Sequence, residues 1–131
     1  NTASTAGIVG APQLAVYSAS KWAVRGLSEA LDAEFRDLGI KVMSLMPWFI
    51  DTPILDMGAK DGANEKMSDQ MKANGATIYP VSMAAEKVWE AAHGDDIQYM
   101  VGGEAERARF MTRWLPSLVR KQIKARVPPR S

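Results

Sequence analysis

The chain has 131 residues, of which 47% are hydrophobic and 24% charged, a composition typical of a globular domain. It has no cysteine, which excludes disulfides and thiolate metal sites, and no apolar run long enough to cross a bilayer. The net charge is +1, but residues 104–131 carry eight Lys or Arg against two Glu. The absence of cysteine fits a reducing compartment, so we expect a cytoplasmic protein.

Residues 1–14 are rich in small side chains, glycine and proline, and they predict the end of a strand followed by a loop. Apolar residues at helical spacing then predict a helix over residues 15–38, with Gly39 in the position of a C-cap glycine. The first half of this helix is apolar on nearly all sides. A helix of this kind needs two surfaces to pack against.

Tyr17 and Lys21 are four residues apart in the predicted helix, so both project from the same face. A free phenol titrates near ~10 and is a poor acid or base in neutral water. A cation about 4 Å away at an effective dielectric of about 20 favours the phenolate by ~4 kcal/mol. The pair is therefore a candidate acid/base device, although a surface helix can also hold such a pair by chance.

A short, mostly apolar run over residues 41–46 predicts a buried parallel strand that ends at Pro47. Ligands of open α/β sheets bind beyond the carboxyl ends of the strands. The loop from Pro47 to Thr52 is therefore expected at the ligand site. Further along the chain, Ser82 is a predicted N-cap of a helix that stops at Gly94, and residues 97–101 predict the last strand.

Residues 104–126 have apolar side chains at helical spacing, basic residues around them and an interruption at Pro116. Such a basic amphipathic region can lie on an anionic membrane surface, cover a substrate cleft or pack against another subunit. No nucleic-acid-binding module accompanies the charge, so we expect no nucleic-acid partner.

Five segments, in order and spacing, resemble the second half of a short-chain dehydrogenase/reductase. The resemblance is dense over residues 1 to about 55 and implies an α/β fold, a doubly wound parallel sheet of Rossmann type. The family's Gly-rich turn and catalytic asparagine do not occur here, so the resemblance implies the C-terminal half of the fold. We expect residues 1–103 to belong to it and residues 104–131 to be a basic extension. The five segments are 1–7 (NTASTAG), 16–21 (VYSASK), 26–31 (GLSEAL), 39–42 (GIKV) and 47–53 (PWFIDTP).

The resemblance assigns catalysis to Ser4, Tyr17 and Lys21 and implies no metal. Tyr17 would exchange a proton with the substrate oxygen, Ser4 would polarise that oxygen, and Lys21 would hold the nicotinamide ribose. Trp48 stands where the family usually has glycine, which brings an indole near the nicotinamide or the substrate. Thr52 can instead be a helix N-cap before Pro53. The cofactor-binding residues implied are Tyr17, Lys21, Pro47, Trp48, Ile50 and Thr52.

The function implied is that of an oxidoreductase that uses NAD or NADP to interconvert a secondary alcohol and a ketone. The alternative is a truncated, catalytically inactive chain that acts only as a structural or interaction piece, and we expect residues 1–131 alone to bind no cofactor tightly. Expected partners are a small carbonyl or alcohol substrate of apolar character, bound partly by residues 53–79, and a second copy packed on the 15–38 helix. Trp22 is a candidate anchor of that interface or a residue of intrachain packing, and residues 104–126 are a candidate for peripheral membrane contact.

Overall fold

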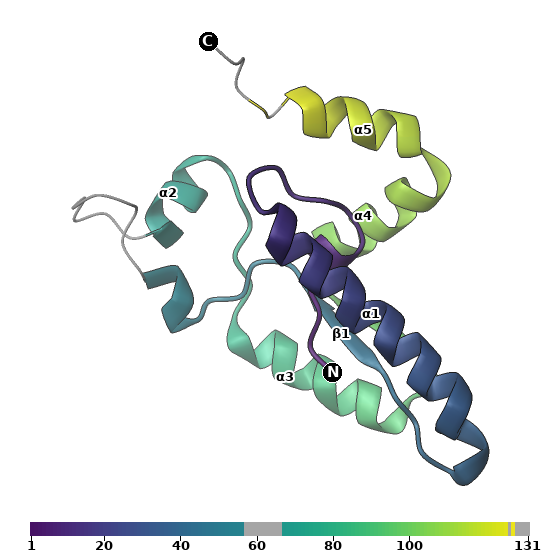
Figure 1. The fold of residues 1–131 in the computed structure, drawn as a ribbon. Helices are drawn as coiled ribbons and strands as arrows, with labels where there is room; N and C mark the ends of the chain where they lie inside the picture. The colour runs from purple at the N-terminus through teal and green to yellow at the C-terminus, as the bar shows by residue number, and fades with distance from the viewer. Residues whose placement is uncertain (57–66, 126, 128–131) are drawn as a thin grey trace.

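A computed structural model describes residues 1–56, 67–125 and 127 (Figure 1). The middle of the predicted substrate segment 53–79 and Arg126 of the predicted basic region lie outside the described residues. The elements within 53–79 are a 3-10 helix, η3 (Pro53–Asp56), and a short helix, α2 (Met67–Ala73).

The long helix predicted over residues 15–38 is confirmed. Helix α1 spans Ala15–Phe35 and continues as a 3-10 turn, η2 (Arg36–Leu38). Gly39 follows with φ +76°, the left-handed conformation in which a C-cap glycine is favoured because it has no Cβ. A second 3-10 turn, η1 (Thr5–Gly7), precedes α1 and was not predicted.

The sheet is parallel, as the predicted α/β class requires. Strand β1 (Ser44–Pro47) pairs with β2 (Gln98–Val101) in the register Ser44 to Gln98 through Pro47 to Val101. On the other edge of β1, Thr2 forms an isolated parallel bridge to Leu45. Three parallel segments therefore lie side by side, and a buried core forms over them from Ala3, Ile8, Met46, Met100 and Ala105.

Strand β1 begins at Ser44 rather than at residue 41, so the predicted start was wrong. The backbone N–H of Val42 donates to the Asp32 carboxylate at 3.0 Å instead of entering the sheet. Pro47 is the last residue of the strand, as predicted. The hydrogen bond from the Val42 amide to the Asp32 side chain is a tertiary contact. The local hydrophobic pattern therefore could not predict it.

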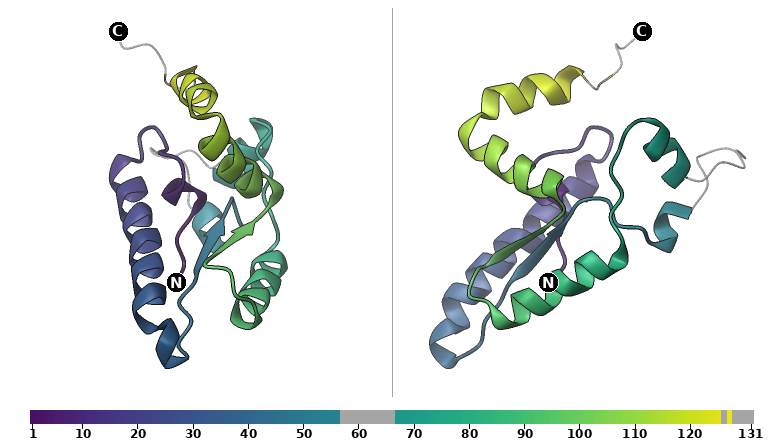
Figure 2. Two further views of the ribbon diagram at one scale, coloured as in Figure 1. Left: turned by 90° about the vertical axis from the view of Figure 1, so that its right-hand side faces the viewer. Right: turned by 180° about the vertical axis from the view of Figure 1, so that it is seen from behind.

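Helices α1 and α3 (Val81–His93) lie on opposite sides of the strands (Figure 2). The end of α3 at Gly94 agrees with the prediction, but Ser82 is not the N-cap. Pro80 takes the N-cap position in extended conformation, with φ −67° and ψ 151°, and makes no side-chain cap. The fixed φ of proline suits this position, so the helix starts one residue after it.

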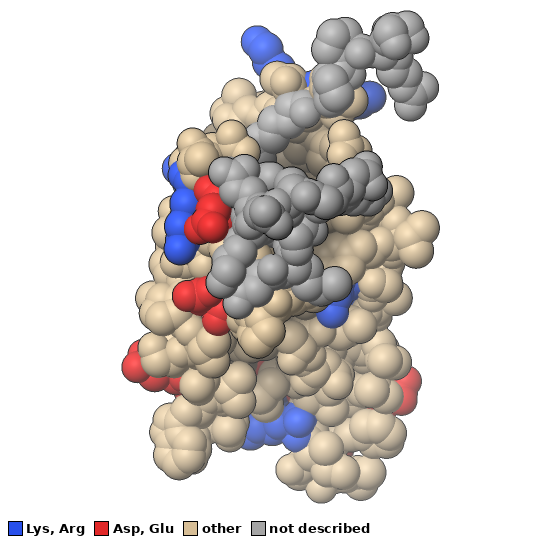
Figure 3. All heavy atoms as spheres, turned by 90° about the vertical axis from the view of Figure 1, so that its left-hand side faces the viewer, with Lys and Arg blue, Asp and Glu red and all other residues tan. Residues whose placement is uncertain are grey.

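The basic C-terminal region forms two helices, α4 (Gly103–Trp114) and α5 (Pro116–Ala125), so the predicted interruption at Pro116 is confirmed. Proline is tolerated in the first turn of a helix but not inside one, which explains a new helix that starts there. None of the described helices combines the length and the apolar character needed to span a membrane. On the face shown in Figure 3, acidic and basic side chains are scattered among uncharged ones.

Asp32 ties the end of α1 to the start of β1. It is buried, accepts the Val42 amide, and receives two hydrogen bonds from Arg36 at 2.9 Å. The Val42 amide and the Arg36 guanidinium hold the pKa of Asp32 below its ordinary value of 3.8. Because folding lowers the pKa of Asp32, its ionised carboxylate stabilises the fold. This stabilisation is fully present above pH 3.8, the pKa in the unfolded chain, and is lost as the pH falls through the pKa of the folded state.

We therefore expect Asp32→Asn to lower the melting temperature by several degrees at pH 7. The difference from wild type should narrow as the pH falls below 3.8, where the Asp32 carboxylate becomes protonated in the unfolded chain. Circular dichroism melts at several pH values measure this. Asp37→Asn makes the same charge change at a neighbouring exposed residue and should leave the melting temperature unchanged. A constant difference across the pH range would contradict the prediction.

Candidate active site

Ser4 lies just beyond the N-terminal strand segment, next to the carboxyl end of β1. The amide of Ala3 donates to Leu45 O at 2.9 Å, and the Thr5 hydroxyl donates to Pro47 O at 2.9 Å. The Ser4 side chain is the N-cap of η1 and accepts a hydrogen bond from the Ala6 amide at 3.2 Å. Two parallel strand ends thus meet at Ser4, where open α/β sheets bind their ligands.

The turn η1 packs directly on α1. A Cβ added at Gly7 would lie 2.7 Å from the Lys21 carbonyl oxygen, so glycine permits this close approach of two backbones. Ser18, which is buried, accepts the Ala11 amide at 3.1 Å and holds the following loop against the same helix. The role of Ser18 was missed from the sequence, because its partner is seven residues away in an irregular loop.

Tyr17 and Lys21 lie together on α1, as their spacing predicted. The Lys21 ammonium is 5.6 Å from the centre of the Tyr17 ring, within the range of a cation–π contact. The same ammonium donates to Thr2 O at 3.3 Å, two residues before Ser4. Tyr17 is 44% exposed, and its hydroxyl bonds to no residue in the described part of the chain. Lys21 therefore contacts both the tyrosine and the strand that leads to Ser4.

The loop after β1 pairs with Tyr79. Tyr79 donates its amide to Phe49 O at 2.9 Å and accepts the Asp51 amide at 2.8 Å. Ile50 lies between these two bonds, and its own amide donates to no acceptor within residues 1–56, 67–125 and 127. The Thr52 hydroxyl donates to Ile50 O at 3.4 Å. The loop is thus held by the backbone of residue 79, and the Ile50 amide is left for another acceptor.

Trp48 packs inward from this loop. Its ring is partly buried against the core cluster and makes an edge contact with Phe49, with ring centres 5.0 Å apart. The indole Nε1 is buried and has no hydrogen-bond partner among the described residues. A buried indole N–H usually has a partner, so this donor is suited to an acceptor not supplied by the described protein.

Tyr79 was not predicted as a functional residue, although it fixes the loop. Its hydroxyl donates to Glu104 at 2.5 Å and accepts the Gly103 amide at 3.0 Å, and a Cβ at Gly102 would overlap its ring. The bond to Glu104 raises the pKa of Tyr79, while the Thr77 hydroxyl and then Tyr79 lower the pKa of Glu104. The Gly102-Gly103 pair is the signal in the sequence that marks this close approach.

The donors around this loop fit a nicotinamide nucleotide. A carboxamide oxygen and ribose hydroxyls are hydrogen-bond acceptors, and the site offers the Lys21 ammonium and the Ile50 amide as donors. No group of three or more His, Cys, Asp or Glu residues that could hold a metal occurs in the described part. Two cavities of the described structure, of about 570 and 270 Å³, are not lined by Ser4, Tyr17 or Lys21.

Comparison with known proteins relates this chain to one family. The family model "short chain dehydrogenase" matches residues 1–61. The chain is 42% identical over 74 residues to an NADP-dependent (R)-specific alcohol dehydrogenase of Lentilactobacillus kefiri, covering 55% of this chain and 29% of that protein. It is 42% identical over 55 residues to a cyclohexanol dehydrogenase of Acinetobacter sp. strain SE19, covering 42% of this chain and 22% of that protein.

Solved structures show the same fold. A short-chain dehydrogenase of Burkholderia cenocepacia J2315 in complex with NADP superposes with a TM-score of 0.74 at 22% identity, covering 94% of this chain and 46% of that one. One from Mycobacterium paratuberculosis bound to NAD has a TM-score of 0.57 at 27% identity, covering 76% of this chain and 41% of that one. The chain spans less than half the length of each of these four proteins. With the family-model match and this agreement in fold, the chain belongs to the short-chain dehydrogenase family.

Proposed function

We propose that this chain corresponds to the C-terminal half of an NAD(P)-dependent oxidoreductase that interconverts a secondary alcohol and a ketone. The observation that carries the proposal is the contact of Lys21 with both the Tyr17 ring and the strand segment that leads to Ser4. An exposed phenol, a neighbouring ammonium and a serine beyond a strand end form a proton-transfer site at the edge where α/β sheets bind ligands.

In this proposal Tyr17 gives a proton to the substrate carbonyl oxygen during reduction and takes it back during oxidation. The positive charge of Lys21 stabilises the phenolate that forms when Tyr17 gives up its proton. Ser4 donates a hydrogen bond to the same substrate oxygen and stabilises the charge that develops there. A bound nicotinamide supplies or accepts the hydride. Lys21 and the Ile50 amide would hold it, with Pro47, Trp48 and Thr52 forming the loop around it.

The names of the relatives support this substrate class. One is an (R)-specific alcohol dehydrogenase, and another is a cyclohexanol dehydrogenase, whose named alcohol is secondary. The solved relatives include one with NADP and one with NAD. The proposal therefore includes both NAD and NADP as the cofactor.

Exposed apolar residues support two further proposals about partners. On α1, Val16 is 85% exposed and Leu27 is 55% exposed, a surface suited to a second copy packed on the 15–38 helix. On α4, Phe110 and Trp114 are exposed among basic residues, which supports peripheral membrane contact by residues 104–126. If the chain instead has only a structural role, we expect these contacts with a second copy or a membrane but no catalytic turnover.

Replacing Lys21 tests the cofactor contact. In the complete reading frame that contains this chain, we expect Lys21→Met to raise the KM for the nicotinamide nucleotide and to lower kcat, each about tenfold or more. The reason is that one ammonium would serve both the ribose and the phenolate. Nicotinamide absorbance with a panel of secondary alcohols and ketones measures both constants. Lys121→Met removes an exposed charge from α5 and should change neither, whereas an equal effect of the two variants would contradict the assignment.

A further inference from the structure

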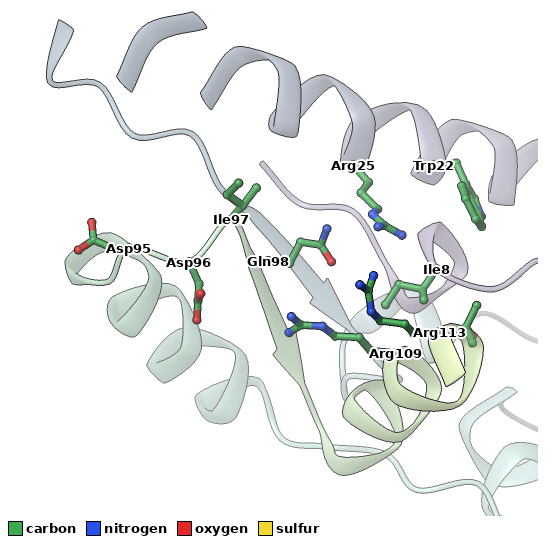
Figure 4. A pocket seen from close by; sticks show the side chains of 10 residues that line it. Ile8, Trp22, Arg25, Asp95, Asp96, Ile97, Gln98, Arg109 and Arg113 are labelled. Carbon is green, nitrogen blue, oxygen red and sulfur yellow. The ribbon is translucent and has the colours of Figure 1, made fainter. Parts of the chain in front are cut away.

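A cavity of about 570 Å³ lies between α1, the start of β2 and α4, away from the candidate active site (Figure 4). It is at the β2 edge, on the far side of β1 from residues 1–3. Its volume falls within the range of about 300–1,000 Å³ typical of small-molecule sites. The residues that line it are Ile8, Trp22, Arg25, Asp95, Asp96, Ile97, Gln98, Arg109, Thr112 and Arg113.

Three guanidinium groups gather in this cavity. Figure 4 shows Arg25 and Arg113 pointing toward one another, while Arg109, next to Arg113, extends toward the side of Asp96. Arg25 is paired with Glu29 at 2.9 Å, but Arg109 and Arg113 have no carboxylate partner among the residues that the structure describes. Like charges this close repel unless an anion lies between them, and guanidinium groups match carboxylates and phosphates in geometry.

The acidic residues of the cavity lie apart from Arg25 and Arg113. Figure 4 shows Asp95 and Asp96 at the end away from Arg25 and Arg113. Asp95 is also occupied, because the Lys41 ammonium pairs with it at 2.7 Å. The arginine end of the cavity therefore keeps a positive charge.

A second cavity of about 270 Å³ adjoins the first beneath α5. Ile8, Trp22 and Thr112 line both, so the two spaces lie next to each other there. The Thr112 hydroxyl is buried at this junction without a hydrogen-bond partner in the described part of the chain. The walls of the second cavity are mainly apolar: Ile8, Val9, Gly10, Trp22, Thr112, Pro116, Val119, Arg120 and Ile123.

We propose that the two cavities form one binding site for an anionic amphiphile, a carboxylate or phosphate group attached to an aliphatic chain. The head group is bound by Arg25, Arg109 and Arg113, and the Thr112 hydroxyl donates to an oxygen near it. The aliphatic chain lies against Val119 and Ile123, where burial of apolar surface favours binding. Because Ser4, Tyr17 and Lys21 do not line the site, its ligand is distinct from the substrate of the proposed reaction.

Calorimetry on the complete reading frame tests the two halves of the site separately. The ligands are laurate, dodecyl phosphate, dodecanol and inorganic phosphate, each below the concentration at which it aggregates. Binding of laurate, dodecyl phosphate or both, at least about tenfold tighter than dodecanol and inorganic phosphate, supports the proposal. The amphiphile that binds with the lower Kd shows whether the site prefers a carboxylate or a phosphate head group. Equal binding of dodecanol would show unspecific apolar binding and overturn the proposal.

Variants then locate the ligand. Arg113→Gln is expected to weaken binding of the preferred amphiphile about tenfold, because it removes one charged donor. Arg107→Gln makes the same change on the same helix outside both cavities and should leave binding unchanged. Val119→Asp should weaken binding of the amphiphile because it places a charged carboxylate in the apolar half. Thermal melts confirm that each variant is folded.

Two outcomes of the variant series would overturn the site. One is equal affinity in the Arg113 and Arg107 variants. The other is that Arg113→Gln changes the oligomeric state, measured by light scattering, and leaves binding of the amphiphile unchanged. The cavity would then be an interface between copies of the chain. All readouts are binding or assembly, so they are independent of catalytic turnover.

Discussion

Tyr17→Phe is expected to lower nicotinamide-dependent turnover of the complete reading frame by at least about 100-fold, the lower end of the contribution of general acid/base catalysis. The change deletes one oxygen, and with it the proton donor of the proposed reaction. It removes no hydrogen bond of the fold, because the Tyr17 hydroxyl has no partner among the described residues. Nicotinamide absorbance, followed at saturating cofactor and alcohol, measures kcat directly.

A matched control is available in strand β2. Tyr99→Phe removes the same oxygen from a buried tyrosine whose hydroxyl accepts the Asp96 amide at 3.1 Å. It should lower stability slightly and leave kcat within about twofold of wild type, since Tyr99 lies outside the catalytic group. Unchanged turnover in Tyr17→Phe would remove Tyr17 from the chemistry. No turnover in any form, including wild type, would favour the structural alternative.

Gly102→Ala is expected to destabilise the fold by about 2–5 kcal/mol, from backbone strain together with overpacking. Gly102 has φ +96°, a conformation that residues with a Cβ rarely adopt, and the added methyl would overlap the Tyr79 ring. Relief of the overlap requires Tyr79 to move away from Glu104, which also releases the loop of residues 49–51. Denaturant unfolding gives the free energy directly.

Gly103→Ala is the control for this change. Gly103 has an ordinary φ, and the Cβ of an alanine would lie 3.6 Å from the Tyr79 hydroxyl, a normal contact. Gly103 is also the first residue of α4, where alanine is a good helix former. The control should therefore unfold at the same denaturant concentration as wild type or slightly higher. Equal losses in both variants would contradict the role of the Tyr79 ring.

Local signals in the sequence were sufficient to predict the helices whose ends they mark. The long helix of residues 15–38, its glycine cap at Gly39 and the break at Pro116 all appear in the structure. Each depends on backbone conformations that neighbouring residues set, such as the left-handed φ of glycine and the missing N–H of proline. The Tyr17 and Lys21 pair follows from the same helical geometry.

Contacts between distant residues decided the rest. Strand β1 starts late because the Asp32 carboxylate, ten residues away, accepts the Val42 amide. The loop after β1 is fixed by Tyr79 and Glu104, which lie 25 residues apart in the sequence.

The sequence by itself determined the long helix and its cap, and its family resemblance predicted the parallel α/β class that the structure shows. The catalytic roles of Ser4, Tyr17 and Lys21 stay a prediction from the same resemblance. The tertiary structure alone decided which donors remain without partners and which side chains enclose the arginine-lined cavity. The physical reason is that helix periodicity and capping depend on residues a few positions apart. Hydrogen-bond satisfaction and cavity shape depend instead on groups that only folding brings together.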